Sequence, residues 1–123
     1  MSAAIRTQAN FVTSDSPLIV RVADDFSRFP GPRFKSDGPF SGQEFRETLL
    51  EPKFLEARER QAELMIDLDG AVGYPTSFLE ESFGGLARLY GAEVVLKHLR
   101  FHSTDEPGLE REITSYISDI ASK

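Results

Sequence analysis

Apolar positions in the first half of the chain predict two strands. Between residues 17 and 23, Leu18, Val20 and Val22 fall on one face of an extended chain, and β-branched residues dominate the segment. Residues 64–68 form a short apolar run that ends at Asp69-Gly70. Such a run predicts a strand that is buried on both faces.

Residues 41–60 have the pattern of a helix. Ser41 is followed three residues later by Glu44, a spacing typical of a capping box, in which the hydroxyl and the carboxylate each accept a backbone N–H. The apolar residues that repeat at helical spacing are Phe45, Leu49 and Leu50. Because a proline inside a helix loses one hydrogen bond and clashes with the preceding turn, Pro52 predicts a kink or break near Glu51.

A second helix is predicted to begin at Thr76-Ser77. Ser77 and Glu80 repeat the capping-box spacing, with Ser77 as the N-cap. Four apolar residues then recur at helical spacing: Leu79, Phe83, Leu86 and Tyr90. Gly84-Gly85 lowers the helix propensity by about 1 kcal/mol per residue relative to alanine. We therefore expect another backbone to approach this helix closely at the two glycines.

The pattern of the remaining segments indicates a layered domain. Residues 93–101 are predicted to form a strand in which Val94, Leu96, Leu99 and Phe101 point inward with one change of phase. An amphipathic helix is predicted from Leu109 to Ile120, and residues 33–36 are predicted to add a short strand. The alternation of strands and helices predicts a single α/β domain over residues 17–123, after a flexible segment at 1–16.

Composition narrows the functional classes. The chain has 123 residues, a net charge of −6 and no cysteine. The acidic balance argues against nucleic acid as the main partner, because phosphates are neutralised by a basic face. The lack of cysteine excludes disulfides, thiolate metal sites and a cysteine nucleophile. No apolar run approaches the length of a membrane span, so we expect a cytoplasmic protein that does not bind membranes.

The run SFLEESFGGL after a DLDG turn resembles the STAS-like domain family of unknown function, whose namesakes include the anti-sigma-factor antagonists. The similarity extends from about Phe29 to about His102, and RFKSDGPFSGQEFRETLLEP matches its N-terminal half. The resemblance implies a mixed sheet of four to five strands packed with three to four helices. It also implies a non-enzymatic regulatory module without a cofactor, whose partner is a histidine-kinase-like ATPase.

The resemblance further implies a switch by phosphorylation. In the related antagonists a serine at the start of the helix after this strand is phosphorylated, and the matching position is Thr76, with Ser77 beside it. Here Pro75 replaces an aspartate and Phe78 a glycine of that pattern. The partner is expected to contact the preceding loop and the exposed side of the helix, through Tyr74, Pro75, Thr76, Phe78, Glu81, Ser82 and Arg88.

Three other patterns carry alternative functions. Asp67 and Asp69 after a strand are typical of a magnesium-dependent phosphatase, and together with Glu80 and Glu81 they offer oxygen ligands for a cation. The excess of acidic residues is compatible with an inhibitor that mimics nucleic acid. The three basic residues Arg28, Arg33 and Lys35 are candidates for an anion-binding site. The alternative for that loop is solvated charges over aromatic residues packed into the core. We expect His98 and His102 to be surface or edge residues.

Overall fold

The described residues are organised on a sheet of three parallel strands. The computed structural model describes residues 17–121. The strands β2 (Leu18–Arg21), β3 (Leu64–Asp67) and β4 (Leu99–His102) lie side by side in that order. Each residue of β3 is paired in register with one residue of β2 and one of β4, so all three strands end at the same edge.

This sheet differs from the one implied by the resemblance. The described residues form three strands, all parallel, and not a mixed sheet of four to five. Residues 33–36 do not form a strand, because Lys35–Asp37 is a single 3₁₀ turn. The segment 1–16, which we predicted to be flexible, lies outside the described residues.

The crossover from β2 to β3 is helical, as predicted. It comprises α2 (Gly42–Phe45), a π-helical turn at Arg46–Leu50 and α3 (Glu51–Arg60). The Ser41 hydroxyl accepts the backbone N–H of Glu44 at 3.0 Å, which confirms the predicted cap. No break occurs at Glu51, whose backbone stays helical; instead, a π-helical turn ends at Leu50 and widens the helix just before Pro52.

The crossover from β3 to β4 begins with a continuous helix of residues 76–90. It consists of α4 (Thr76–Leu79), a π-helical turn and α5 (Gly85–Tyr90), and α6 (Ala92–His98) follows. The helix starts one residue before the predicted cap: Pro75 holds the N-cap position, and no side chain caps the end. Ser77 is therefore not the N-cap, and replacing it by alanine removes no capping hydrogen bond.

The strand predicted at residues 93–101 is wrong for most of its length. Ala92–His98 is helical, and only Leu99–His102 is extended. Ala92, Val95 and His98 are buried at a spacing of three residues, as expected for one face of a short helix. The change of phase in the apolar pattern marks the passage from helix to strand.

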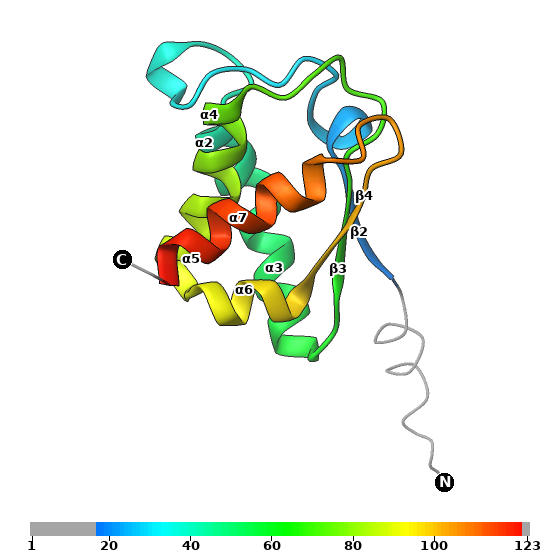
Figure 1. Ribbon diagram of the computed structural model, residues 1–123, viewed down its shortest axis with the longest axis vertical. Coiled ribbons are helices and arrows are strands. Elements are labelled where there is room, and N and C mark those ends of the chain that lie inside the picture. The colour runs from blue at the N-terminus through cyan, green and yellow to red at the C-terminus, as the bar shows by residue number, and fades with distance from the viewer. Residues whose placement is uncertain (1–16, 122–123) are drawn as a thin grey trace, which may run out of the picture.

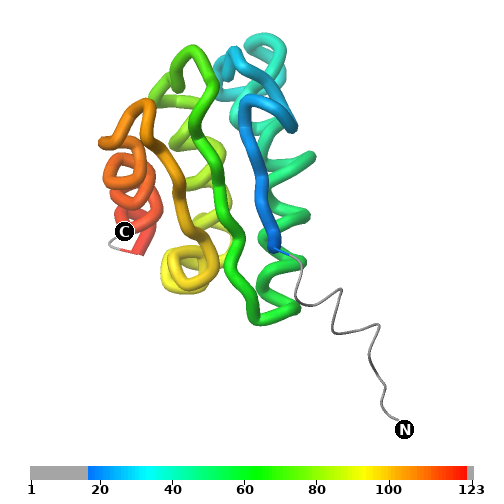
Figure 2. The backbone as a smooth tube through the Cα atoms, turned by 90° about the vertical axis from the view of Figure 1, so that its right-hand side faces the viewer, coloured from blue at the N-terminus to red at the C-terminus, as the bar shows by residue number. Residues whose placement is uncertain are grey.

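The described helices cover one face of the sheet and leave the other face open. Figure 1 shows the strands to the right of the helices, and Figure 2 shows the strands in front with helices behind them; α7 (Leu109–Ala121) packs beside α6. Burial alternates along β3, in which Leu64 and Ile66 are buried while Met65 and Asp67 are half-buried. The prediction of a strand buried on both faces is therefore wrong, although the strand itself is confirmed.

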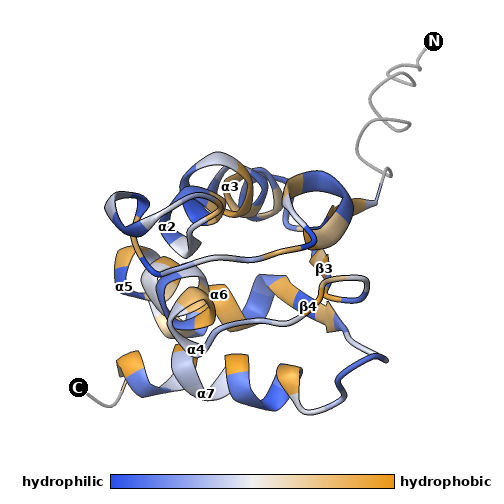
Figure 3. Ribbon diagram, turned by 90° about the horizontal axis from the view of Figure 1, so that it is seen from above, coloured by the Kyte–Doolittle hydropathy of each residue, from blue (hydrophilic) through white to orange (hydrophobic). Residues whose placement is uncertain are grey.

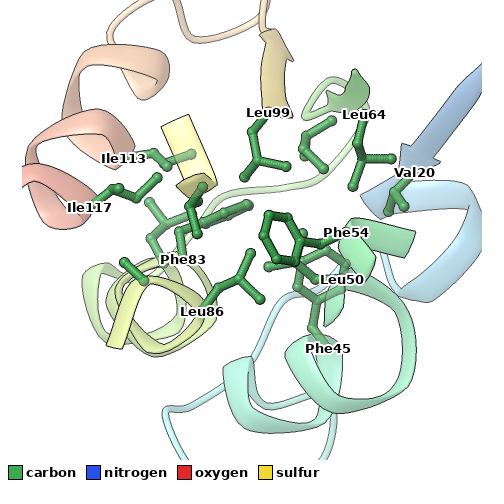
Figure 4. Packing of buried hydrophobic residues seen from close by; sticks show 14 of the residues in the cluster. Val20, Phe45, Leu50, Phe54, Leu64, Phe83, Leu86, Leu99, Ile113 and Ile117 are labelled. Carbon is green, nitrogen blue, oxygen red and sulfur yellow. The ribbon is translucent and has the colours of Figure 1, made fainter. Parts of the chain in front are cut away.

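One hydrophobic core lies between the sheet and the helices (Figure 4). Sheet residues such as Val20 and Leu64 contribute to it together with Phe54 from α3. The predicted stripe of α7 also contributes, since Ile113 and Ile117 are fully buried. Figure 3 shows the apolar residues of α7 on the side that faces the other helices. None of the helices within 17–121 combines the length and the apolar character required to cross a membrane.

Candidate functional site

The carboxyl ends of the three strands bring three loops together at one edge of the sheet, at the top of Figure 1. These loops follow β2, β3 and β4, and the helix of residues 76–90 begins at the same edge. In open parallel sheets, ligands bind preferentially beyond the carboxyl ends of the strands. This edge is therefore the first place to expect a functional site.

Asp69 ties the loop after β4 to the loop after β3. Its Oδ1 accepts the backbone N–H groups of Thr104 at 2.8 Å and Asp105 at 2.9 Å, and its Oδ2 accepts the Thr104 hydroxyl at 2.5 Å. Asp105 in turn accepts the N–H of Gly70 at 2.9 Å. The hydrogen bond from Asp105, followed by those from Thr104, lowers the pKa of Asp69. The second aspartate of the DLDG turn thus has a structural role.

The loop after β2 lies against the other side of the same segment. The N–H of Val72 donates to the carbonyl of Arg28 at 2.8 Å, and Arg28 Nε donates to the carbonyl of Gly70 at 3.4 Å. Residues 70–75 are thereby held between the loops that follow β2 and β4. This arrangement gives the loop after β3 a defined position at the edge of the sheet.

Two large apolar side chains are exposed where these loops meet. Phe29, next to Arg28, is 67% exposed, and Val72 is 71% exposed. We define Phe29, Val72, Pro75 and Thr76 as the rim surface; all four are exposed in the structure. The expectation that the aromatic residues of the 26–42 loop pack into the core is wrong for most of them, since Phe34 and Phe40 are also exposed.

The segment predicted to meet a partner is open. Tyr74 and Ser77 are half-buried, while Pro75 and Thr76 between them are exposed. The Tyr74 side chain holds this segment against the end of β3, because its hydroxyl donates to the carbonyl of Leu68 at 2.8 Å. Burial, and then the nearby carboxylates of Asp67 and Asp69, raise the pKa of Tyr74, so this hydroxyl stays protonated as a donor.

Three of the predicted contact residues point into the molecule instead. Phe78 is fully buried in the core, and Ser82 is buried with its hydroxyl donating to the carbonyl of Gly42 at 3.3 Å. Glu81 is also buried, and its carboxylate accepts Arg46 at 3.0 Å. The side of the helix that carries these residues packs against α2, so they are not available to a docked partner. Arg88 is exposed, as predicted.

The predicted anion site does not form, because its three basic residues have separate partners. Arg33 contacts Glu80 at 2.6 Å, and Lys35 contacts Glu47 at 2.8 Å. Arg28 donates to the backbone carbonyl of Gly70. The side chains thus do not converge on a common point, and two of the three charges are neutralised by carboxylates.

A network of ion pairs joins the first half of the chain to the 76–90 helix. Glu80 contacts both Arg33 and Arg88 at 2.6 Å, and these hydrogen bonds, that of Arg88 first, lower its pKa. A Cβ on Gly84 would lie 2.6 Å from Glu80 Oε2, and one on Gly85 would lie 2.8 Å from Arg46 Nε. The two glycines therefore make room for charged side chains, and not for another backbone as we expected.

The histidines differ from each other and partly from expectation. His98 is buried, and its Nδ1 lies 2.8 Å from the carbonyl of Ala62, so it is not a surface residue. His102 is exposed, as expected, and its Nε2 lies 3.2 Å from Asp69 Oδ2. One ligand atom each of Asp67, Asp69 and His102 lie within 4.8 Å of one another. Sequence patterns did not reveal this group, because the predicted strand of residues 93–101 did not indicate that His102 is paired with Asp67.

Comparison with family models matches residues 41–109 to a family described as a STAS-like domain of unknown function. The match covers more than half of the chain and spans both crossover units, including the loop from Leu68 to Pro75. It supports the resemblance found in the sequence, although it begins and ends later than the range expected there. The comparisons with curated proteins and with solved structures returned no significant match.

Proposed function

This chain belongs to the STAS-like domain family of unknown function, and on that premise we propose that it is a regulatory module that binds a partner protein through the rim surface. The observation that carries the proposal is the exposure of Phe29 and Val72 on two loops joined by a hydrogen bond. Large apolar side chains exposed on adjoining loops are typical of protein interaction sites. They flank the segment whose counterpart is regulatory in the anti-sigma-factor antagonists that this chain resembles.

The class of partner follows from that resemblance. We propose a histidine-kinase-like ATPase, which would contact the rim surface. A non-enzymatic role fits the chemistry of the edge better than the phosphatase alternative does. A phosphatase of this type needs the second aspartate, Asp69, as a proton donor. The hydrogen bonds from Asp105 and Thr104 lower the pKa of Asp69 and so favour its ionised form, which cannot donate a proton.

Replacing both apolar side chains of the rim surface should weaken partner binding. We expect the double variant Phe29→Ser/Val72→Ser to lower the affinity for the ATPase encoded nearest to this protein's gene by at least about tenfold, because exposed aromatic and aliphatic anchors dominate such interfaces. Isothermal titration calorimetry with the two purified proteins measures this change. Stability should be nearly unaffected, since neither side chain is part of the core.

Leu89 offers a matched control for this experiment. It is 56% exposed on α5, outside the rim surface, so Leu89→Ser removes a comparable exposed apolar group. We expect the affinity of this variant to stay within about twofold of the wild type. No binding by the wild type, or equal losses in the control and the double variant, would contradict docking at the rim surface.

Phosphorylation of Thr76 would provide the switch. Thr76 is exposed at the first position of α4, where added negative charge is tolerated by the helix dipole. A phosphate there would stand on the rim surface itself and would have to lose its hydration when a partner docks. The modified protein should therefore bind its partner more weakly.

Incubation with the ATPase and ATP, followed by peptide mass spectrometry, tests this switch. We expect one phosphate per chain in the wild type and in Ser77→Ala, and none in Thr76→Ala. Because neither side chain caps the helix, both variants should fold as the wild type does. Phosphate on Ser77, or none in the wild type, would contradict the assignment of Thr76.

A further inference from the structure

We propose that Asp67, Asp69 and His102 form a binding site for a divalent transition-metal ion of the zinc type, with water completing its coordination. Asp67 ends β3 and His102 ends β4, and the two residues are paired in register. Paired residues of neighbouring strands project to the same face, and here it is the face that no described helix covers (Figure 2). Asp69 follows two residues after Asp67 and lies at the same edge.

The distances fit such a site after small side-chain movements. One ligand atom from each residue lies within 4.8 Å of the other two. Zinc bonds of about 2.0–2.2 Å in a tetrahedron place neighbouring ligand atoms about 3.3–3.6 Å apart. His102 Nε2 and Asp69 Oδ2 already lie 3.2 Å apart, close to this spacing, and the His102 side chain is 53% exposed and free to adjust.

The types of donor indicate the class of ion. Two carboxylates with one imidazole suit zinc and similar transition metals, whereas magnesium and calcium prefer oxygen ligands alone. Three protein ligands leave one coordination position for water. His102 therefore distinguishes this proposal from a magnesium site made by Asp67 and Asp69.

The surroundings prepare one ligand and keep the local charge negative. The N–H groups of Thr104 and Asp105 donate to Asp69 Oδ1, and the Thr104 hydroxyl donates to its Oδ2; such outer contacts fix the orientation of a metal ligand. Arg21 is paired in register with Asp67, and Arg28 donates to the carbonyl of Gly70, so two guanidinium groups lie near the three carboxylates of Asp67, Asp69 and Asp105. The balance of charge still favours a cation.

Titration of the untagged full-length chain with zinc chloride, followed by calorimetry, tests the site. We expect one zinc ion per chain, and we expect Asp67→Asn and His102→Gln each to lower the affinity at least about tenfold, since even outer-shell partners contribute 10–100-fold. Glu59→Gln, at an exposed carboxylate on α3, is the matched control and should bind as the wild type does. Urea unfolding checks that the variants remain folded.

The histidine ring resonances in NMR spectra locate the ion. Zinc should shift the signals of His102 and leave those of the buried His98 in place. The proposal is wrong if no saturable binding occurs, if the two site variants bind as tightly as the wild type, or if His98 responds in place of His102. Binding of magnesium at equal affinity, unchanged in His102→Gln, would also overturn it.

Discussion

Replacing Arg46 by methionine should lower the free energy of unfolding by about 2–3 kcal/mol. The Arg46 guanidinium lies between α2 and the 76–90 helix, where it contacts the carboxylate of Glu81 at 3.0 Å and the carbonyl of the same residue at 3.3 Å. Both side chains are nearly buried, 13% and 11% exposed. Methionine fills the volume of the arginine stem but leaves the buried carboxylate without its nearest cation.

The loss should be smaller than for a fully isolated buried charge. Removing one partner of a buried pair typically destabilises by about 3–5 kcal/mol, but Arg33 and Arg88 each remain 3.6 Å from Glu81. Urea denaturation followed by circular dichroism measures the difference. The double variant Arg46→Met/Glu81→Met should recover most of the loss, because it leaves no unpaired charge.

Lys35→Met is the matched control for Arg46→Met. Its ion pair with Glu47 lies at the surface, and such pairs contribute about 0–1 kcal/mol. If Arg46→Met destabilised no more than Lys35→Met, the network would contribute nothing to the position of the 76–90 helix. If the double variant were as unstable as Arg46→Met, packing and not charge would explain the loss.

The substitution Gly42→Ala should destabilise the protein by about 2–3 kcal/mol. Gly42 is buried at the start of α2, and a Cβ there would lie 2.5 Å from the backbone carbonyl oxygen of Phe78. It would also lie 3.1 Å from the Ser82 hydroxyl. Since the nearest atom belongs to backbone, the two helices have to move apart. This loss outweighs the gain of up to about 1 kcal/mol that alanine offers as a better helix former.

Gly73→Ala provides the control for Gly42→Ala. A Cβ on Gly73 would meet no atom within 4 Å, and the residue does not need a left-handed backbone, so its replacement should change stability by less than about 1 kcal/mol. Thermal unfolding of both variants tests the difference. A Gly42→Ala protein as stable as the wild type would show that α2 and α4 separate without loss, and that the start of α4 is held by other contacts.

Local signals in the sequence predicted much of the fold. The alternation around Val20, the apolar run at β3 and the cap at Ser41 each depend on neighbouring residues, and each gave an element that the structure confirms. The stripe of α7 was predicted for the same reason. The segment at α6 failed, because seven residues make too short a helix for its period to be separated from that of the strand that follows.

The candidate site was less predictable. Pro75 and Thr76 are exposed, as expected for the contact segment that the resemblance implied. The sequence did not predict the burial of Phe78, Glu81 and Ser82, because it does not show which side of the 76–90 helix packs against α2. The cluster of Asp67, Asp69 and His102 depends on the pairing of β3 with β4, which joins residues far apart in the chain.

The sequence by itself determined where most elements begin and end, and which residues have the apolar character of a core. Hydrophobic periodicity and capping operate over a few residues, so they can be read without the fold. The tertiary structure alone decided which charges are neutralised, which apolar side chains remain on the rim surface and which face of the sheet stays open. These outcomes follow from contacts between distant segments, such as Arg33 with Glu80 and Val72 with Arg28, and no local pattern encodes them.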